Sequence, residues 1–185
     1  MSQRQHAEIC IASKRLVLRP FSAGDADATF PCITPSLTRF MSWEPPADRR
    51  HFDSIWQAWL PLIASGKDFV FTIRRESCGS FLGLAGLHDV HAGTAKLGIW
   101  IREDCHGHGF GREAVRLVAT WASRAIDIES FTYPVAEANL PSRRIAESLG
   151  GVIEKREETP KYTSLIYRIP GQSPDNGGRS NGQQQ

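Results

Sequence analysis

The sequence predicts a single α+β domain in which helices flank a mostly antiparallel sheet of about seven strands. The composition of the 185 residues, 41% hydrophobic and 23% charged, is typical of one globular core. Three strand-like segments follow one another at short spacing in the middle of the chain. Segments with a helical spacing of apolar residues lie before and after them, and further strand candidates lie towards the C-terminus.

The N-terminal third predicts one strand and two helices. Residues 15–21 are rich in β-forming residues and predict the strand. Ser22 or Asp25 can then cap a short helix, and Asp48 can cap a longer one. Pro61 is expected to kink or end the longer helix, because its ring removes a backbone hydrogen bond. The apolar side chains of that helix recur every three or four positions: Phe52, Ile55, Trp56, Trp59 and Leu60.

The middle of the chain predicts an antiparallel meander followed by a helix. The three strands lie at residues 69–75, 80–90 and 95–101, and the short connections between them have the composition of hairpin turns. From Gly109 a helix of about four turns is predicted, with one apolar face that packs against the sheet. This face carries Phe110, Ala114, Leu117, Val118, Trp121 and Ala125.

The C-terminal elements are a strand at residues 130–135, a helix at 139–151 and two strands at 151–157 and 162–169. Asn139 is a favourable cap for this helix. The glycine pair at the end of the helix can supply the left-handed residue that terminates it.

The folded domain is expected to span residues 14–170. Residues 1–13 precede the first strand candidate and are expected to form a flexible N-terminus. Residues 171–185 contain none of the hydrophobic residue types, so burial cannot offset the entropy lost on ordering them. We therefore expect this segment to be a disordered tail.

Charge and cysteine content exclude several classes of protein. Lys and Arg number 22 against 20 Asp and Glu, with no dense basic run, so neither a nucleic acid nor a membrane is a predicted partner. The cysteines lie far apart without a CxxC pair, which argues against a zinc site and a disulfide scaffold, and no metal is expected. Without a signal peptide or a long apolar run, the expected location is cytoplasmic. The cysteines are Cys10, Cys32, Cys78 and Cys105.

Three glycines, Gly107, Gly109 and Gly111, lie between the strand that ends near Ile101 and the following helix. A helix N-terminus has unpaired N–H groups and a partial positive charge, and it binds phosphate readily. Glycines leave no Cβ atom to hold an anion away. The spacing differs from the dinucleotide fingerprint and from the P-loop, so a tight turn packed under a helix is the alternative interpretation.

Residues 106–111 resemble the pyrophosphate loop of the GNAT acetyltransferases, in which two spaced glycines follow a Gln or Arg. His106 stands in the Gln or Arg position, and Gly109 and Gly111 stand in the glycine positions. Further segments are similar, in order and spacing, to the branch typified by RimJ and RimL, the N-terminal acetyltransferases of ribosomal proteins. These segments are residues 14–30, 81–90, 95–101 and 139–151, and the resemblance covers about residues 14–169.

The resemblance implies a sheet that splits between its fourth and fifth strands, here residues 97–101 and 131–135, with acetyl-CoA lying in the split. The loop backbone would hold the pyrophosphate, and the main chain of the fourth strand would pair with the pantetheine arm. His108 and Arg112 would either contact phosphates or be solvated. The residues implied to bind the cofactor are Ile99, Trp100, Ile101, His106, Gly107, His108, Gly109, Phe110, Gly111, Arg112, Asn139 and Ser142.

Many GNAT enzymes protonate the leaving thiolate with a tyrosine, whose position here is Ala146. In the RimJ and RimL branch a serine takes this place, and Ser142 matches it on the same helix face. The resemblance implies that Ser142 stabilises the thiolate and that Asn139 holds a pantetheine amide. Both residue types are also what a helix start prefers. The nearest tyrosine is Tyr133.

The general base is not assigned from the sequence. The family often carries a glutamate at the position that Lys96 occupies here. The remaining candidates are His88, Asp89, His91 and Glu44, acting directly or through water.

The acceptor site is expected near residues 39–46. In the resembling branch this segment builds one wall of the acceptor pocket. Phe40 and Trp43 would line the wall, and Glu44 would attract an ammonium group, with His88 on another side. The alternative is that these side chains only pack beside a helix start.

The expected activity is N-acetyl transfer from acetyl-CoA to a primary amine by direct attack in a ternary complex, with protein or peptide N-termini as the first choice of acceptor. A small amine, such as a polyamine, an amino acid or an aminoglycoside, is the alternative. A non-catalytic CoA-binding sensor is another, because Ala146 and Lys96 stand where chemistry is expected. A nucleotide-binding oxidoreductase would carry its glycine fingerprint after the first strand, whereas the glycine run here lies in the middle of the chain after the meander, so this class is not expected. The oligomeric state is undetermined, and a homodimer remains open.

Overall fold

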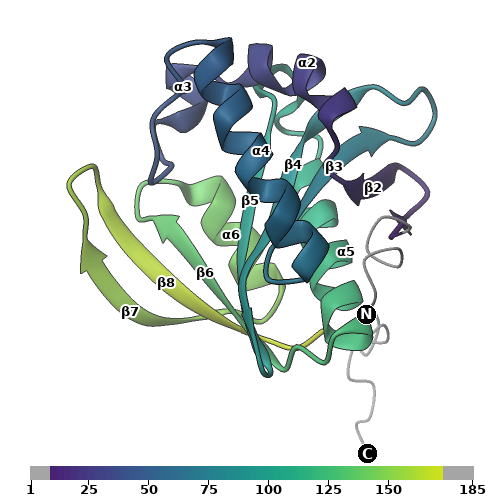
Figure 1. Ribbon diagram of the computed structural model, residues 1–185. Coiled ribbons are helices and arrows are strands. Elements are labelled where there is room, and N and C mark those ends of the chain that lie inside the picture. The colour runs from purple at the N-terminus through teal and green to yellow at the C-terminus, as the bar shows by residue number, and fades with distance from the viewer. Residues whose placement is uncertain (1–8, 173–185) are drawn as a thin grey trace, which may run out of the picture.

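One eight-stranded sheet runs through the molecule, in the order β1-β2-β3-β4-β5-β6-β8-β7 (Figure 1). The protein is described from a computed structural model, which covers residues 9–172. Only β5 and β6 pair in parallel, which confirms a mostly antiparallel sheet with one strand more than predicted. The strands are β1 (Ile11–Ala12), β2 (Leu16–Pro20), β3 (Phe69–Arg75), β4 (Phe81–His91), β5 (Thr94–Ile101), β6 (Ser130–Ala136), β7 (Val152–Glu158) and β8 (Thr163–Pro170).

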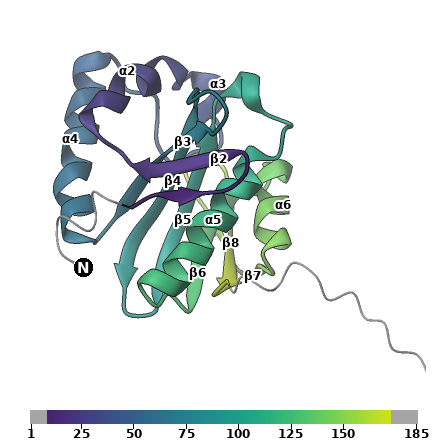
Figure 2. The same ribbon diagram turned by 90° about the vertical axis from the view of Figure 1, so that its right-hand side faces the viewer.

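Helices cover both faces of the sheet. The helix α4 and the short helices before it lie on one face, and α5 and α6 lie on the other (Figure 2). Within residues 9–172, no helix has both the length and the apolar character needed to cross a membrane. The helical elements are η1 (Ala23–Asp25), α2 (Ala26–Thr29), η2 (Phe30–Cys32), α3 (Pro35–Thr38), α4 (Arg49–Ser65), η3 (Glu103–Cys105), α5 (Phe110–Ala125) and α6 (Leu140–Ser148).

Each face of the sheet has its own hydrophobic core. Leu84 of β4 packs in a cluster with Phe52 of α4, whereas the neighbouring Ala85 belongs to the cluster under α5. This alternation follows from the pleat of a strand, in which successive side chains point to opposite faces. The central strands are therefore apolar on both sides, and together the two clusters hold the sheet between its helical layers.

The helix α4 begins where the sequence predicts and passes through its proline. The Asp48 carboxylate accepts a hydrogen bond from the backbone N–H of His51, at 2.7 Å, and so caps the helix. Pro61 lies inside α4, which continues to Ser65, so the proline does not end the helix. Pro61 is exposed, and water can therefore satisfy the carbonyl that its missing N–H would have bonded.

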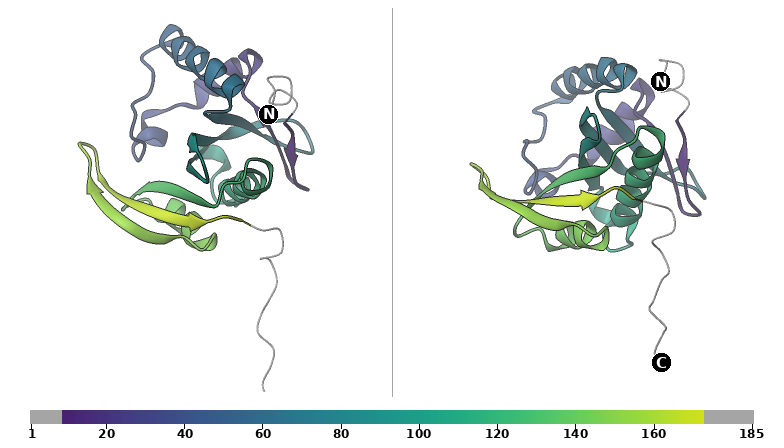
Figure 3. Two further views of the ribbon diagram at one scale, coloured as in Figure 1. Left: turned by 60° about the horizontal axis from the view of Figure 1, so that its bottom comes forward. Right: turned by 90° about the horizontal axis from the view of Figure 1, so that it is seen from below.

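The sheet splits between β5 and β6. These strands pair only at Thr94 with Ser130, Ala95 with Phe131 and Lys96 with Thr132. Beyond that point β6 pairs only with β8, and the β6–β8–β7 unit turns away from the rest of the sheet (Figure 3). The predicted position of the split is confirmed. The edge of β5 that faces β6 has no strand partner over residues 97–101.

The packed region extends beyond the predicted domain at both ends. Ile9 and Ile11 are buried in the core under α5, and β1 pairs with β2, so residues 9–13 are not the flexible segment we expected. Their apolar side chains supply the burial that orders them. At the other end, Gln172 donates its backbone N–H to Ser123 Oγ, at 3.0 Å. The rest of the predicted flexible N-terminus and tail, residues 1–8 and 173–185, lies outside the described residues.

Candidate active site

The loop between β5 and α5 adopts two left-handed conformations. Gly107 has φ +80° and Gly109 has φ +76°, which side chains other than glycine adopt at a cost. Gly109 occupies the N-cap position of α5, and no side chain bonds the free N–H groups of the first turn. The start of α5 is therefore open to an anion, which the unpaired N–H groups and the helix dipole would attract.

Gly111 lies where the first turn of α5 packs against two other elements. A Cβ atom there would lie 3.4 Å from Ile145 of α6 and 3.6 Å from Ile101 of β5. These are ordinary van der Waals separations, so the packing could accommodate a Cβ atom at this position. The backbone conformation thus accounts for Gly107 and Gly109, and phosphate binding at the loop stays a prediction.

The two histidines of this loop have partners within the loop and strand. His106 Nε2 donates to the backbone carbonyl of Ile101, at 2.6 Å, and ties the loop to the end of β5. His108 Nδ1 lies 2.8 Å from the carbonyl of His106, and its ring stacks on Phe110 at 5.7 Å between centroids. His106 therefore shapes the loop, and the side chain of Arg112 is exposed beside it.

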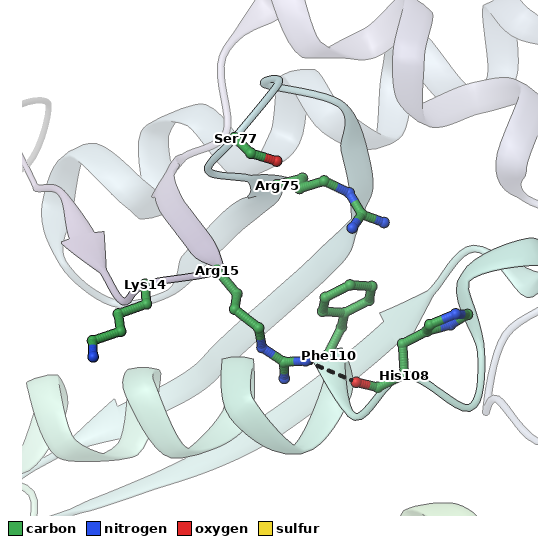
Figure 4. Close-up of a pocket in the computed structure, with 6 residues that line it drawn as sticks. All are labelled: Lys14, Arg15, Arg75, Ser77, His108 and Phe110. Carbon is green, nitrogen blue, oxygen red and sulfur yellow. Dashed lines mark hydrogen bonds between the residues drawn. The ribbon is translucent and has the colours of Figure 1, made fainter.

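A positively charged pocket of about 260 Å³ adjoins the loop (Figure 4). The guanidinium groups of Arg15 and Arg75 lie 5.1 Å and 5.0 Å from the centroid of the buried Phe110 ring. Arg15 also pairs with Glu113, whereas Lys14 and Arg75 have no carboxylate partner within residues 9–172. An anion held at the loop would meet this positive field. The pocket is lined by Lys14, Arg15, Arg75, Ser77, His108 and Phe110.

Sequence reasoning did not find Lys14, Arg15 and Arg75 as site residues. Lys14 and Arg15 come from the β1–β2 connection, and Arg75 is the last residue of β3, so all three lie far from the glycine loop in the chain. No spacing or motif links these segments to the loop. Only the pairing of β1, β2 and β3 brings them together.

The start of α6 carries a serine that bonds to a buried tyrosine. Asn139 Oδ1 accepts a hydrogen bond from the backbone N–H of Ser142, at 3.2 Å, so Asn139 caps the helix. Ser142 Oγ lies 2.9 Å from the hydroxyl of Tyr133 on β6. Burial raises the pKa of Tyr133 to about 12, although the bond to Ser142 opposes that shift. Tyr133 is therefore neutral at physiological pH and can donate a hydrogen bond to Ser142.

The position where many relatives carry a tyrosine is closed here. Ala146 is completely buried in the core under α5. A tyrosine side chain would have to displace that core. The hydroxyl group at the start of α6 is instead that of Ser142, which bonds to Tyr133 of β6.

The predicted acceptor segment is fastened to the β7–β8 hairpin. Lys161, in the connection between those strands, donates to the carbonyls of Thr38 and Trp43, at 3.0 Å and 3.2 Å. Its ammonium group also pairs with Glu44, at 2.8 Å. The carboxylate that is predicted to attract the ammonium group of the acceptor is thus already paired with a cation of the protein. Trp43 is exposed, and Phe40 is half-buried.

The base candidates differ in their surroundings. Asp89 pairs with Lys96 at 2.8 Å, and this bond lowers the pKa of the Asp89 carboxyl. His91 is exposed at the end of β4. His88 bonds through Nδ1 to Asp68, at 3.1 Å, and none of the hydrogen bonds of residues 9–172 joins it to Phe40, Trp43 or Glu44. Asp68 was not found from the sequence.

A sequence profile described as "Acetyltransferase (GNAT) domain" matches residues 15–152. The chain belongs to the GNAT acetyltransferase family. It is an acetyl-CoA-dependent N-acetyltransferase by family. Within residues 9–172, no group of three or more His, Cys, Asp or Glu side chains could hold a metal ion. A relative from Bacillus licheniformis, described as uncharacterized N-acetyltransferase p20, is 25% identical over 140 residues, which are 74% of this chain and 79% of the relative.

Solved GNAT structures share the fold at low identity. The ribosomal-protein-S5-alanine acetyltransferase from Vibrio fischeri matches with a TM-score of 0.78 and 13% identity, over 93% of this chain and 100% of its own. RimL, the ribosomal L7/L12 α-N-protein acetyltransferase, in complex with CoA matches with a TM-score of 0.80 and 17% identity, over 88% of this chain and 98% of its own. Spermidine N-acetyltransferase from Vibrio cholerae, in complex with CoA and spermine, matches with a TM-score of 0.75 and 16% identity, over 86% of this chain and 97% of its own.

Proposed function

We propose that this enzyme acetylates the N-terminal amine of a protein or peptide by direct attack on acetyl-CoA in the split between β5 and β6. The observation that carries the proposal is the Ser142–Tyr133 hydroxyl pair at the start of α6, beside that split. A serine at this position is one of the features by which the chain resembles the RimJ and RimL branch. The likeness to RimL-type structures supports the same acceptor class.

The site suits the phosphates and the pantetheine arm of acetyl-CoA. The free N–H groups at the start of α5 and the cations of the adjoining pocket would hold the phosphates. The unpaired edge of β5 over residues 97–101 would bond the amides of pantetheine as a neighbouring strand would. When bound, acetyl-CoA supplies the thioester that the amine attacks.

The hydroxyl pair would act where negative charge develops. As the carbon–sulfur bond breaks, the sulfur retains the electron pair, and a hydrogen bond from Ser142 would stabilise it. With the neutral Tyr133 as the donor to Ser142 Oγ, the serine hydrogen would be free to point towards the sulfur. A serine hydroxyl is too weak an acid to transfer its proton fully, so its role is to stabilise the thiolate.

The charges on the acceptor side favour a peptide over a polycation. Polyamines and aminoglycosides carry several ammonium groups, and recognition of these groups needs free carboxylates. Here Glu44 is paired with Lys161, and Asp89 is paired with Lys96. The exposed Trp43 and half-buried Phe40 instead offer an apolar surface for peptide side chains.

A thiol-release screen tests the acceptor class. Purified enzyme and acetyl-CoA are combined with peptides that have a free N-terminus, with spermidine or with an aminoglycoside, and free CoA thiol is measured. We expect the highest kcat/KM for a peptide. A higher kcat/KM for spermidine or the aminoglycoside would contradict the proposed acceptor, and CoA binding without thiol release for any amine would indicate the sensor.

A further inference from the structure

We propose that His88 is the general base of the reaction and that Asp68 is its positioning residue. His88 would take a proton from the ammonium group of the acceptor and so produce the neutral amine that attacks. The proposal rests on acetyl transfer by this site but not on which amine is acetylated. Four observations support it: the fixed orientation of the ring, the space around its free nitrogen, its place beside the split, and the pairing of the competing carboxylates with lysines.

The ring of His88 is held in one orientation. Its Nδ1 lies 3.1 Å from Asp68 Oδ2, and the other oxygen of Asp68 accepts the backbone N–H of Asp89, at 3.0 Å. The segment that carries Asp68 is fixed in turn, because Val90 donates its N–H to the carbonyl of Lys67, at 3.1 Å. A carboxylate at Nδ1 selects the tautomer with its hydrogen on Nδ1 and leaves the lone pair on Nε2.

The free nitrogen lies over two glycines. Gly86 of β4 and Gly98 of β5 are paired in the sheet. A Cβ atom at Gly86 would lie 2.2 Å from His88 Nε2, and one at Gly98 would lie 3.7 Å from it. Both positions thus lack the side chains that would displace or cover the nitrogen. No hydrogen bond within residues 9–172 occupies Nε2.

This nitrogen lies beside the start of the split. Lys96 is the last residue of β5 that pairs with β6, and Gly98 is two residues beyond it. His88 shares a strand face with Leu84, which packs against α4, whereas Ser142 belongs to α6 on the opposite side of the sheet. An amine that approaches from the α4 side would meet His88 first, and the sulfur would leave towards Ser142.

The other candidates are less suitable. Asp89 is paired with Lys96, a bond that lowers the pKa of its carboxyl and weakens it as a base, and Glu44 is paired with Lys161. Imidazole is the side chain whose ordinary titration lies nearest neutral pH, where a base must accept and then release a proton. His88 is also the histidine of β4 that has a carboxylate partner at its Nδ1.

The proposed step balances in protons and electrons. His88 Nε2 accepts one proton from the ammonium group and later releases it to water. The nitrogen lone pair then forms the bond to the carbonyl carbon, and the carbon–sulfur bond breaks with its electron pair on sulfur. The second proton that nitrogen loses on becoming an amide ends on the thiolate. No oxidant or further reactant is required.

The test uses His88→Ala with added imidazole. Loss of a general base should lower kcat/KM by roughly 100-fold or more, with the Kd for CoA unchanged. The space above Gly86 and Gly98 should then admit imidazole, which should raise the kcat/KM of His88→Ala at least tenfold. His91→Ala, which changes an exposed histidine of the same strand, is the control and should keep the wild-type rate. Asp68→Asn should lower kcat more than it changes KM, because it weakens the orientation of the ring.

The outcomes separate this proposal from the proposed function. His88→Gln, which keeps a side chain of similar size, guards against misfolding and should be as slow as His88→Ala. If folded His88→Ala or His88→Gln retains more than half of the wild-type kcat/KM for any accepted amine, His88 is not the base. Failure of imidazole to raise the rate of folded His88→Ala would also overturn the proposal. A wild-type enzyme that acetylates no amine would overturn the proposed function itself.

Discussion

At the scale of single residues, the proposed chemistry would depend on pairs of side chains that different segments of the fold bring together. Ser142 and Tyr133 form one such pair, and His88 and Asp68 form another. In each pair the first residue would face the reacting atoms, and the second fixes its orientation. The first pair would stabilise the leaving sulfur, and the second would prepare the attacking nitrogen.

Replacing Ser142 by alanine tests the first pair. We expect kcat to fall on the order of 10- to 1000-fold, as for loss of one hydrogen-bond donor in a transition state, with little change in the Kd for CoA. The free energy of unfolding should also fall by about 1–3 kcal/mol, because the buried Tyr133 hydroxyl loses its partner. The control is Ser148→Ala at the other end of α6, whose Oγ bonds only to the Ile145 carbonyl. A Ser142→Ala enzyme with more than half of the wild-type kcat would refute the assignment.

The raised pKa of Tyr133 predicts a specific dependence of stability on pH. The folded protein holds this pKa at about 12, above the ordinary tyrosine value near 10. The neutral form is therefore favoured by folding, and its contribution is fully present below pH 10 and is lost as the pH rises through about 12. We expect the free energy of unfolding of the wild type to fall more steeply over this interval than that of Tyr133→Phe. Parallel curves in chemical denaturation would contradict this.

The sequence names Ser142 as a site residue and His88 as one of four open candidates for the base, but it does not reveal the partner of either residue. The cap formed by Asn139 and the position of Ser142 are local features, three residues apart, and a helix start reveals them. Tyr133, by contrast, reaches Ser142 only because α6 packs against β6. Asp68 reaches His88 across 20 residues of chain. Such contacts depend on the packing of elements, which no local pattern specifies.

At the scale of elements, the loop between β5 and α5, which we propose to hold the phosphates of CoA, depends on its backbone conformation. Gly109 has φ +76° at the start of α5, and a Cβ atom there would have enough space but an unfavourable backbone. We expect Gly109→Ala to lower the free energy of unfolding by roughly 1–2 kcal/mol and to weaken CoA binding. Gly66→Ala, at φ +71° at the end of α4, should cost similar stability and leave CoA affinity unchanged, because it lies on the other face. Equal CoA affinities for both variants in a calorimetric titration would contradict the role of the loop.

The proposed acceptor wall, residues 38–44, depends on contacts with the β7–β8 hairpin. Lys161 holds residues 38–44 against the β7–β8 hairpin through two carbonyls and Glu44. Lys161→Met should raise the KM for the acceptor by about tenfold, equivalent to about 1.4 kcal/mol, with kcat and CoA affinity little changed. The control is Lys155→Met in the same hairpin, where the lysine pairs only with Glu157. Steady-state kinetics with unchanged acceptor KM would show that this wall does not meet the acceptor.

The helices and strands were predictable where the periodic pattern of apolar residues extends over many positions. The helices α4 and α5 and the meander of β3, β4 and β5 follow from periodicity and turns. The two-residue strand β1 is too short to show a period, and it forms because Ile9 and Ile11 find space in the core. The passage of α4 through Pro61 depends on that residue being exposed, which the sequence alone does not reveal.

At the scale of the whole molecule, the site exists because one sheet pairs only partly. Three residue pairs join β5 to β6, and beyond them the two halves of the sheet separate. The loop that starts α5 follows β5, and the start of α6 follows β6. The split was predictable only through the resemblance to the GNAT family, because the residue at which parallel pairing stops is a matter of register. The cofactor, the amine and the two hydroxyl groups would meet at this gap.

The most direct test of the account is to locate the transferred acetyl group. The enzyme is incubated with acetyl-CoA and a peptide that has one free N-terminal amine and one internal lysine, and the product is sequenced by mass spectrometry while free thiol is measured. The account predicts one acetyl group on the N-terminal amine for each thiol released, and no reaction with the same peptide after its N-terminus is blocked. Acetylation of the lysine alone, or binding of acetyl-CoA with no acetyl on either amine, would contradict it.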